Sequence, residues 1–190
     1  MVQQTSILNL AVAALAMLVL VALPASSQER EDPVDVAALL DQLADPEEQR
    51  WRRIERQILR EWGRSGSATV DFLFQRGQAA LQAGRPRQAV EHFSAAIDHA
   101  PEFTEAWNAR ATAYYMMNRL GQSMADIEVV LGREPRHFGA LSGMGMILEQ
   151  TERLEGARAA YQAALGVHPH RPQIREALQR LELALAGQAL

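Results

Sequence analysis

The sequence predicts an all-α fold in which short pairs of helices repeat and stack along the chain. The first observation is a proline that recurs every 34 residues, at Pro101, Pro135 and Pro169. The second is a set of small residues with the same period: Gly77, Ala111 and Gly145. The third is that apolar residues within each period step by three and four, the spacing of an amphipathic helix. A shared period of this length is typical of stacked helical repeats, because one unit cannot bury its apolar face alone.

The N-terminal residues have the pattern of an export signal. An apolar run at residues 10–23 precedes the first charged residue, Glu29, and the small residues Ala25 and Ser27 fit the −3 and −1 positions of a signal peptidase site. We expect residues 1–27 to be a signal peptide whose cleavage leaves Gln28 as the first mature residue. An uncleaved N-terminal anchor is the alternative. In both cases the protein acts outside the cytoplasm, in the periplasm or anchored to the membrane and facing it.

Residues 28–69 are expected to form an N-terminal helical segment. Asp32 and Pro33 open a short helix that contains three leucines: Leu39, Leu40 and Leu43. Asp45 and Pro46 are the cap and first turn of a second helix, at residues 47–62, whose apolar stripe is Trp51, Ile54, Ile58 and Trp62. Opposite charges one turn apart, as at Glu48 and Arg52, favour a solvated outer face. We interpret this helix as a cap on the first repeat; the alternative is contact with a membrane surface or an anionic partner.

Three units follow, at residues 70–103, 104–137 and 138–171. A polar break separates the two helices of a unit, at Gly84 in the first and Asn118 in the second. Proline then ends the second helix, since it cannot continue a helical ladder. Four more registers share the period: Leu73, Trp107 and Leu141; Ala89, Ser123 and Ala157; Phe93, Ile127 and Tyr161; Ala96, Val130 and Ala164.

These registers resemble the tetratricopeptide repeat (TPR) family, in which a large residue, a small residue, an aromatic, an alanine and a closing proline recur in this order. The resemblance covers residues 70–171, and its departures are Ala80 and Leu148 in place of a tyrosine and Ser123 in place of an alanine. Residues 172–190 resemble the closing helix of such arrays, with a stripe at Ile174, Leu178, Leu181 and Leu185. The resemblance implies a TPR-type helical-repeat solenoid with an N-terminal helical lead and a C-terminal capping helix.

Composition and charge exclude several functions. With 19 basic against 23 acidic residues, the net charge of −4 gives no reason to bind nucleic acid. No cysteine is present and every basic residue is arginine, so thiol, zinc–thiolate and lysine-amine chemistry are excluded. The five histidines do not have the spacing of metal ligands, and no glycine-rich phosphate loop follows a strand. We therefore expect no enzyme, cofactor, metal or small-molecule substrate.

The resemblance also implies where a partner would bind. In this family the first helix of each unit lines a concave groove, and the matching positions here are Phe74, Gln78, Gln82, Asn108, Thr112, Tyr115, Met116, Ser142, Met146 and Gln150. Family members that grip the C-terminal carboxylates of chaperones use Lys, Arg and Asn, whereas this chain has Phe74, Gln78, Ala109, Gly139 and Gly143 at the corresponding positions. We therefore expect no binding of that kind.

The sequence thus predicts a non-enzymatic scaffold or adaptor of the bacterial cell envelope. A protein or peptide segment would lie in the groove with an apolar anchor near Tyr115, Met116 and Met146, because methionine adapts to irregular apolar surfaces. Packing of Tyr115 and Met116 on a neighbouring helix is the alternative for that cluster. For the whole protein, the alternative is a structural self-association or membrane-tethering module that acts through Trp51 and Trp62, which leaves a homo-oligomer open.

Overall fold

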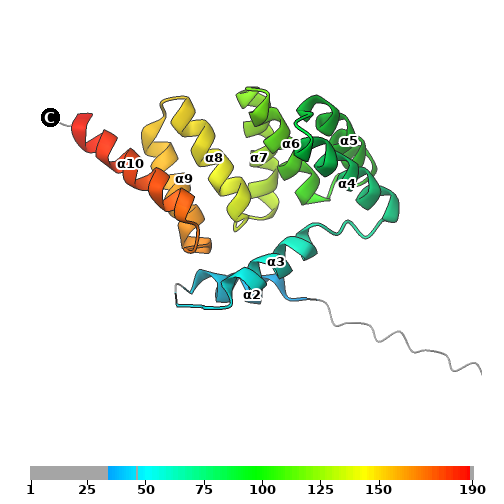
Figure 1. Cartoon of the computed structure of the whole chain (residues 1–190), viewed down its shortest axis with the longest axis horizontal. Coiled ribbons are helices and arrows are strands. Elements are labelled where there is room, and N and C mark those ends of the chain that lie inside the picture. Colours follow the sequence, from blue (N-terminus) through cyan, green and yellow to red (C-terminus); the bar gives the residue numbers. More distant parts are fainter. Residues whose placement is uncertain (1–33, 46, 189–190) are drawn as a thin grey trace, which may run out of the picture. The chain divides into compact units, whose positions relative to one another are not determined.

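The computed structural model describes residues 34–45 and 47–188, and within them it contains nine helices and no strand (Figure 1). The expected all-α solenoid is confirmed. Every described helix belongs to one compact unit, Asp35–Leu190. The expected signal or anchor at residues 1–27 lies outside the described residues. Among the helices that are described, none has the length and apolar character needed to cross a membrane.

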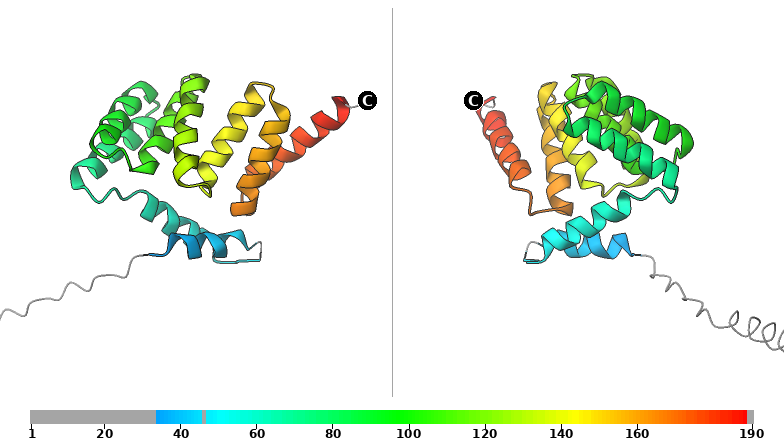
Figure 2. Two further views of the ribbon diagram at one scale, coloured as in Figure 1. Left: turned by 180° about the vertical axis from the view of Figure 1, so that it is seen from behind. Right: turned by 45° about the vertical axis from the view of Figure 1, so that its right-hand side comes forward.

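Six of the described helices form three stacked antiparallel pairs, as Figures 1 and 2 show. The pairs are α4 (Ala68–Gln82) with α5 (Pro86–His99), α6 (Thr104–Met116) with α7 (Leu120–Arg133), and α8 (Phe138–Gln150) with α9 (Leu154–Val167). The turn inside each pair contains one residue with positive φ: 67° at Gly84, 56° at Asn118 and 59° at Glu152. This left-handed residue reverses the chain in a short turn, which explains the glycine and asparagine found there.

The small residues of the period allow the two helices of a pair to touch. A Cβ atom added at Gly77 would lie 2.3 Å from the ring of Phe93, and one at Gly145 would lie 2.4 Å from the ring of Tyr161. In the middle pair the partner at this register is the smaller Ile127, and an alanine, Ala111, fits. Glycine is therefore required where its partner is aromatic.

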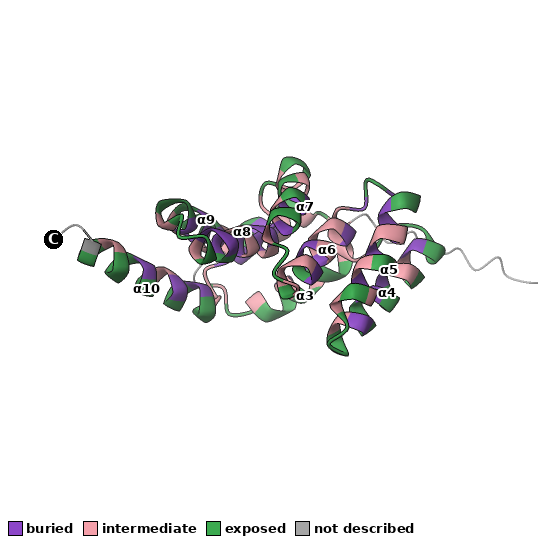
Figure 3. Cartoon of the chain, turned by 90° about the horizontal axis from the view of Figure 1, so that it is seen from above, coloured by how far each residue is buried: buried purple, intermediate pink, exposed green. Residues whose placement is uncertain are grey.

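The last described helix, α10 (Pro172–Gln188), closes the array against α9. Buried and exposed residues alternate along it (Figure 3), and its inner stripe of Ile174, Ala177 and Leu181 joins the core of the third pair. The pattern of apolar residues at spacings of three and four buries one face and leaves the other solvated.

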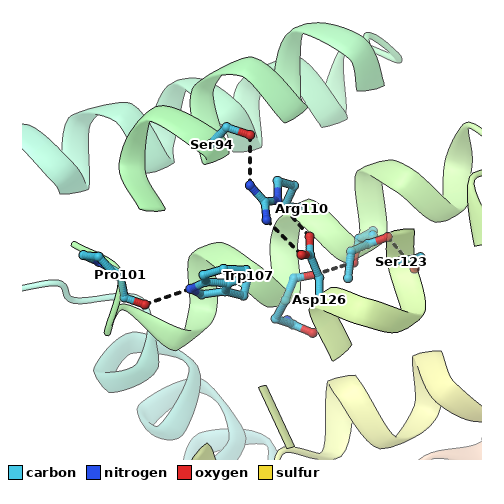
Figure 4. A network of polar contacts seen from close by, with 9 residues as sticks. Ser94, Pro101, Trp107, Arg110, Ser123 and Asp126 are labelled. Carbon is cyan, nitrogen blue, oxygen red and sulfur yellow. Dashed lines mark hydrogen bonds and ion pairs between the residues drawn. The ribbon is translucent and has the colours of Figure 1, made fainter. Parts of the chain in front are cut away.

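A polar network joins the first two pairs (Figure 4). The guanidinium of Arg110 donates two hydrogen bonds of 2.8 Å to the buried carboxylate of Asp126, and a third of 3.1 Å to Ser94 Oγ. This contact raises the pKa of Arg110. Because Ser94 lies on α5, Arg110 on α6 and Asp126 on α7, one side chain fixes the spacing of three helices.

The N-terminal helices α2 (Val36–Ala44) and α3 (Trp51–Trp62) lie along the loops that connect one unit to the next (Figure 2). The expectation that α3 caps the first repeat is wrong. Trp62 stacks on His137 with ring centroids 4.2 Å apart, and Trp51 stacks on His170 at 5.2 Å. Residues of α2 and α3 share a buried cluster with Phe138. The reason is that aromatic rings in the later loops offer an apolar surface for both tryptophans.

The start of α3 also differs from the expected helix at residues 47–62. The Asp45 carboxylate accepts a hydrogen bond from the Glu47 amide, and the Glu48 carboxylate accepts one from the Arg50 amide. These side chains bind turn amides that a helix would otherwise use, so the helix begins only at Trp51. Glu48 pairs with Arg50 at 3.0 Å in place of the expected Arg52. Before α2, Asp35 provides the cap, and the expected Asp32 and Pro33 lie outside the described residues.

Candidate functional site

A pocket of about 240 Å³ lies between the first helices of the second and third pairs, and we call it the α6–α8 pocket. Helices α6 and α8 form its walls, α7 contributes to its lining, and the start of α10 closes one end. The lining residues are Asn108, Ala111, Thr112, Tyr115, Ser123, Ile127, Gly139, Ser142, Gly143, Met146, Arg171 and Ile174.

Five of the ten expected groove residues meet in this pocket. Asn108, Thr112 and Tyr115 come from α6, and Ser142 and Met146 come from α8. Their spacings of three and four place each set on one face of its helix, which is why register alone could identify them.

The polar side chains of the pocket mostly donate to backbone carbonyls of the helices or to a neighbouring carboxylate. Thr112 Oγ donates to the Asn108 carbonyl at 3.1 Å, and Ser142 Oγ donates to the Phe138 carbonyl at 2.7 Å. The amide nitrogen of Asn108 donates to Glu105 at 3.0 Å. Since these donors are occupied, the surface open to a ligand is dominated by apolar groups. The pocket can therefore hold an apolar side chain.

A second and wider hollow of about 710 Å³ lies between α8 and α10, and we call it the α8–α10 pocket. Tyr115, Met146 and Gln150 line it, together with α10 residues that include Ile174 and Arg180. Tyr115 and Met146 line both pockets, so the two form one continuous groove. The pattern of the closing helix predicted its buried stripe, but gave no signal for its approach to α8.

Two charged groups along the α8–α10 pocket, Glu149 and Arg180, are paired within the wall. The hydroxyl of Tyr161 donates to Glu149 Oε2 at 2.7 Å, and Arg180 lies 3.6 Å from the other oxygen of Glu149. Burial and the Glu149 carboxylate raise the pKa of Tyr161, so its hydroxyl remains a donor. This edge of the groove offers a peptide both acidic and basic neighbours.

Phe74 does not lie in the groove, and its expected place is corrected. Its side chain is 3% exposed and packs on Phe93 and Phe103, with ring centroids 5.6 and 5.1 Å away. A large apolar side chain at this position is more stable between the helices than in water. The register identified the position correctly, but the size of the side chain decided which way it packs.

The remaining four expected residues are exposed. Gln78 and Gln82 lie on α4 and line neither pocket. Met116 is 52% exposed and lines neither pocket, so it does not pack on a neighbouring helix in the manner of Tyr115. Gln150 lines the α8–α10 pocket and donates a hydrogen bond of 3.0 Å to Asn118.

Arg171 is a lining residue that the sequence did not reveal. Its guanidinium donates to Glu55 of α3 at 3.0 Å and lies over the ring of Phe138, 4.8 Å from the centroid. The same Glu55 lies 3.2 Å from Nε2 of the buried His168. Helix α3 therefore orients a cation at the closed end of the α6–α8 pocket.

His137 connects this end of the groove to α6. Its Nδ1 accepts a hydrogen bond of 3.0 Å from the Ala140 amide, so Nε2 bears the proton and donates to Glu105 at 2.9 Å. The ring thus caps α8 and ties it to the second unit. Within residues 34–45 and 47–188, no three His, Asp or Glu side chains are arranged to hold a metal ion.

Comparisons with known proteins agree with this architecture. The sequence profile of the tetratricopeptide repeat matches residues 74–128 and 117–173. A TPR repeat-containing protein of Rhizobium etli is 39% identical over 134 residues, which cover 70% of this chain and 66% of that protein. The Hsp70-Hsp90 organizing protein of Triticum aestivum is 29% identical over 112 residues, which cover 59% of this chain and 19% of that one. The chain thus spans less than two thirds of the length of either relative.

Among solved structures, the fold is similar to that of the first TPR of Spaghetti (RPAP3) bound to the HSP90 peptide SRMEEVD. The TM-score is 0.61 at 21% identity, and the match covers 63% of this chain and 95% of the other. At this level of identity the likeness supports the fold alone.

Proposed function

Because the chain belongs to the tetratricopeptide repeat family, we propose that it is a protein-binding adaptor that holds a segment of a partner protein in the groove formed by the α6–α8 and α8–α10 pockets. The single observation that carries the proposal is the apolar α6–α8 pocket on the side of α6 and α8 where the family's groove lies. A pocket of about 240 Å³ accommodates one or two apolar side chains of an extended or helical segment. A related domain of similar fold has been solved with a bound peptide, which supports this mode of use.

The anchor of the partner would contact Tyr115, Met146 and Ile174. These three side chains line both pockets. Met146 is 40% exposed, so a partner that covers it gains apolar burial without any rearrangement of the core.

The proposed place of action is the bacterial cell envelope, in the periplasm or at the membrane facing it. The proposal rests on the apolar run at residues 10–23 and the small residues before Gln28. A relative from the bacterium Rhizobium etli is consistent with it. The proposed role is assembly or organisation of other proteins, and not catalysis.

Self-association through Trp51 and Trp62 is less well supported by the geometry. The two indole rings stack on His170 and His137 of the same chain, so they are already engaged. The groove, by contrast, has an exposed methionine and an open pocket. The groove is therefore the better supported binding surface.

The test is capture of envelope proteins by the full chain in a bacterial host, by crosslinking and mass spectrometry. Met146→Arg places a charge in both pockets and should abolish capture of a defined partner. Met116→Arg is the matched control, because Met116 is an exposed methionine that lines neither pocket. Equal capture by the two folded variants would contradict the groove.

A peptide assay tests the absence of a carboxylate clamp. The peptide SRMEEVD should not bind with micromolar affinity, because the matching positions include Ala109, Gly139 and Gly143 in place of cationic side chains. Isothermal titration with the peptide and with its C-terminal amide measures this. Micromolar affinity that depends on the free carboxylate would disprove the expectation.

A further inference from the structure

The outward face of α3 is strongly basic. Arg52, Arg56 and Arg60 follow one another at intervals of four residues, and Arg53 lies beside them, so all four project from one side of the helix. All four are exposed, and Leu59, which is 42% exposed, lies among them. We call these five residues the arginine face.

The acidic residues of α3 are turned away from this face. Glu55 lies on the inner side, where it contacts His168 and Arg171. Glu61 pairs with Arg64 at 3.3 Å. In the part of the chain that the structure describes, the four arginines of the face form no ion pair. The guanidinium of Arg52 lies over the ring of Trp51, 4.4 Å from its centroid. The acidic and basic side chains of α3 are similar in number, but they lie on different sides of the helix.

We propose that the arginine face binds the surface of a bilayer that contains anionic phospholipids. Guanidinium groups recognise phosphate oxygens by charge-assisted, often bidentate hydrogen bonds, and cations near an anionic leaflet are attracted to it. An exposed leucine among the cations suits the boundary between head groups and acyl chains. A purely ionic ligand would give no role to Leu59.

The position of this face in the chain favours a membrane over other anionic partners. The apolar run ends at Leu23, and only residues 24–33 separate it from the described structure. Fully extended, such a segment spans at most about 35 Å. If the N-terminal run stays in the bilayer as an anchor, the first described residue therefore lies within that distance of its surface. Trp51 and Trp62 are not needed for contact with lipid because they face inward.

The arginine face differs from the groove of the adaptor function in its position and in the class of its ligand. The test is cosedimentation of the full chain with vesicles of phosphatidylglycerol and phosphatidylcholine, compared with vesicles of phosphatidylcholine alone. The test variant carries Arg52→Gln, Arg53→Gln, Arg56→Gln and Arg60→Gln. The matched control carries four changes of the same kind at exposed arginines of the repeats: Arg76→Gln, Arg85→Gln, Arg87→Gln and Arg153→Gln.

We expect wild type and control to bind the anionic vesicles more tightly than neutral ones, and the binding to weaken as salt rises. The test variant should lose on the order of 500-fold in affinity for the anionic vesicles, since each of the four arginines near such a surface contributes roughly fivefold. Circular dichroism establishes that both variants fold. Any contribution of residues 10–23 is common to all three proteins and cancels.

Three outcomes would overturn the inference. They are equal binding of wild type to neutral and anionic vesicles, equal loss in test and control variants, and a preference of the arginine face for a DNA duplex or polyglutamate over the anionic vesicles at equal charge concentration. The last outcome would assign the face to a nucleic acid or an acidic protein. Capture of envelope proteins through Met146 is measured separately, so the two proposals can fail independently.

Discussion

The first unit and the two later units share one register but use their inner sides differently. Phe74, Asn108 and Ser142 occupy the same position at intervals of 34 residues. Phe74 is 3% exposed and packs on Phe93 and Phe103. Asn108 and Ser142 line the α6–α8 pocket. A large apolar side chain at this position fills the space between neighbouring helices, whereas a smaller or polar side chain leaves a pocket.

The loops between units show the same contrast. Phe103, His137 and Arg171 also share a register. Phe103 is 6% exposed and part of the apolar core of the first unit, whereas His137 stacks on Trp62 and Arg171 binds Glu55. Helix α3 therefore covers the later loops, where polar and aromatic partners are available. The repeat period therefore sets the position of each residue. The size and polarity of the side chain decide whether that position is packed in the core or is open to another element or a partner.

Replacement of Phe74 is the strongest way to separate the two kinds of unit. Phe74→Ala should lower the free energy of unfolding by about 3–5 kcal/mol, because it leaves a cavity in a close-packed core. Ser142→Ala, at the same register, should cost only about 1 kcal/mol for one hydrogen bond. Urea denaturation followed by circular dichroism measures both. Losses of similar size would mean that the two positions are equally structural.

The glycines provide a second and smaller contrast. Gly77→Ala should destabilise by about 1–3 kcal/mol, because the new Cβ would lie 2.3 Å from the ring of Phe93, which is fully buried. Gly143 lines the α6–α8 pocket. In a Gly143→Ala variant the new Cβ would lie 3.2 Å from the terminal methyl of Ile127. That methyl can move, and alanine favours the helix by up to about 1 kcal/mol, so the net change should be small. Thermal unfolding of the two variants tests this, and a Gly143→Ala variant as unstable as Gly77→Ala would contradict it.

The smallest effect expected is a dependence on pH confined to the later units. Burial, with the nearby Arg171 guanidinium, holds the pKa of His168 below its usual value, although Glu55 opposes the shift. In the unfolded chain His168 titrates at about pH 6.5. As the pH falls, the unfolded chain therefore binds a proton at His168 more readily than the folded chain does. Stability is then fully present above about pH 7 and falls as the pH decreases through 6.5 toward the lower pKa of the folded state.

Denaturant titrations at pH 7.5 and pH 5.5 should detect this loss in wild type. In His168→Gln the part of the loss that is due to His168 should disappear, while the contributions of carboxylates elsewhere remain. His170→Gln serves as the matched control, because His170 stacks on Trp51 but is not fully buried. The same pH dependence in wild type and His168→Gln would refute the assignment.

The helix pairs could be predicted from the sequence because the residue pattern that specifies them lies within one unit and recurs in each. The contact of Gly77 with Phe93 and that of Gly145 with Tyr161 lie within single units, so one period describes both. The docking of α3 had no such signal. Its stripe of Trp51, Ile54, Ile58 and Trp62 predicted that a partner surface exists, but contact with His137 joins residues far apart in the chain and depends on the stacked structure.

The site was predictable to the extent that it follows the period. Asn108, Thr112 and Ser142 were found because register transfers from one unit to the next. Phe74 was misplaced because register carries position but not volume. Arg171 and Ile174 were missed because they belong to the start of the closing helix, whose approach to α8 is a property of the assembled array.

The position of α3 has a consequence for the affinity of the groove. Through Trp62 the helix contacts His137, which caps α8 and bonds to Glu105 of α6, and through Glu55 it contacts Arg171 at the start of α10. One helix therefore fixes the spacing of the elements that line the α6–α8 pocket before any partner arrives. A preorganised pocket loses less conformational entropy on binding, and it selects side chains by size because the helices that form its walls are held at a fixed spacing. Loss of the contacts that hold α3 against the repeats should therefore widen the range of partners that bind and lower the affinity for each of them.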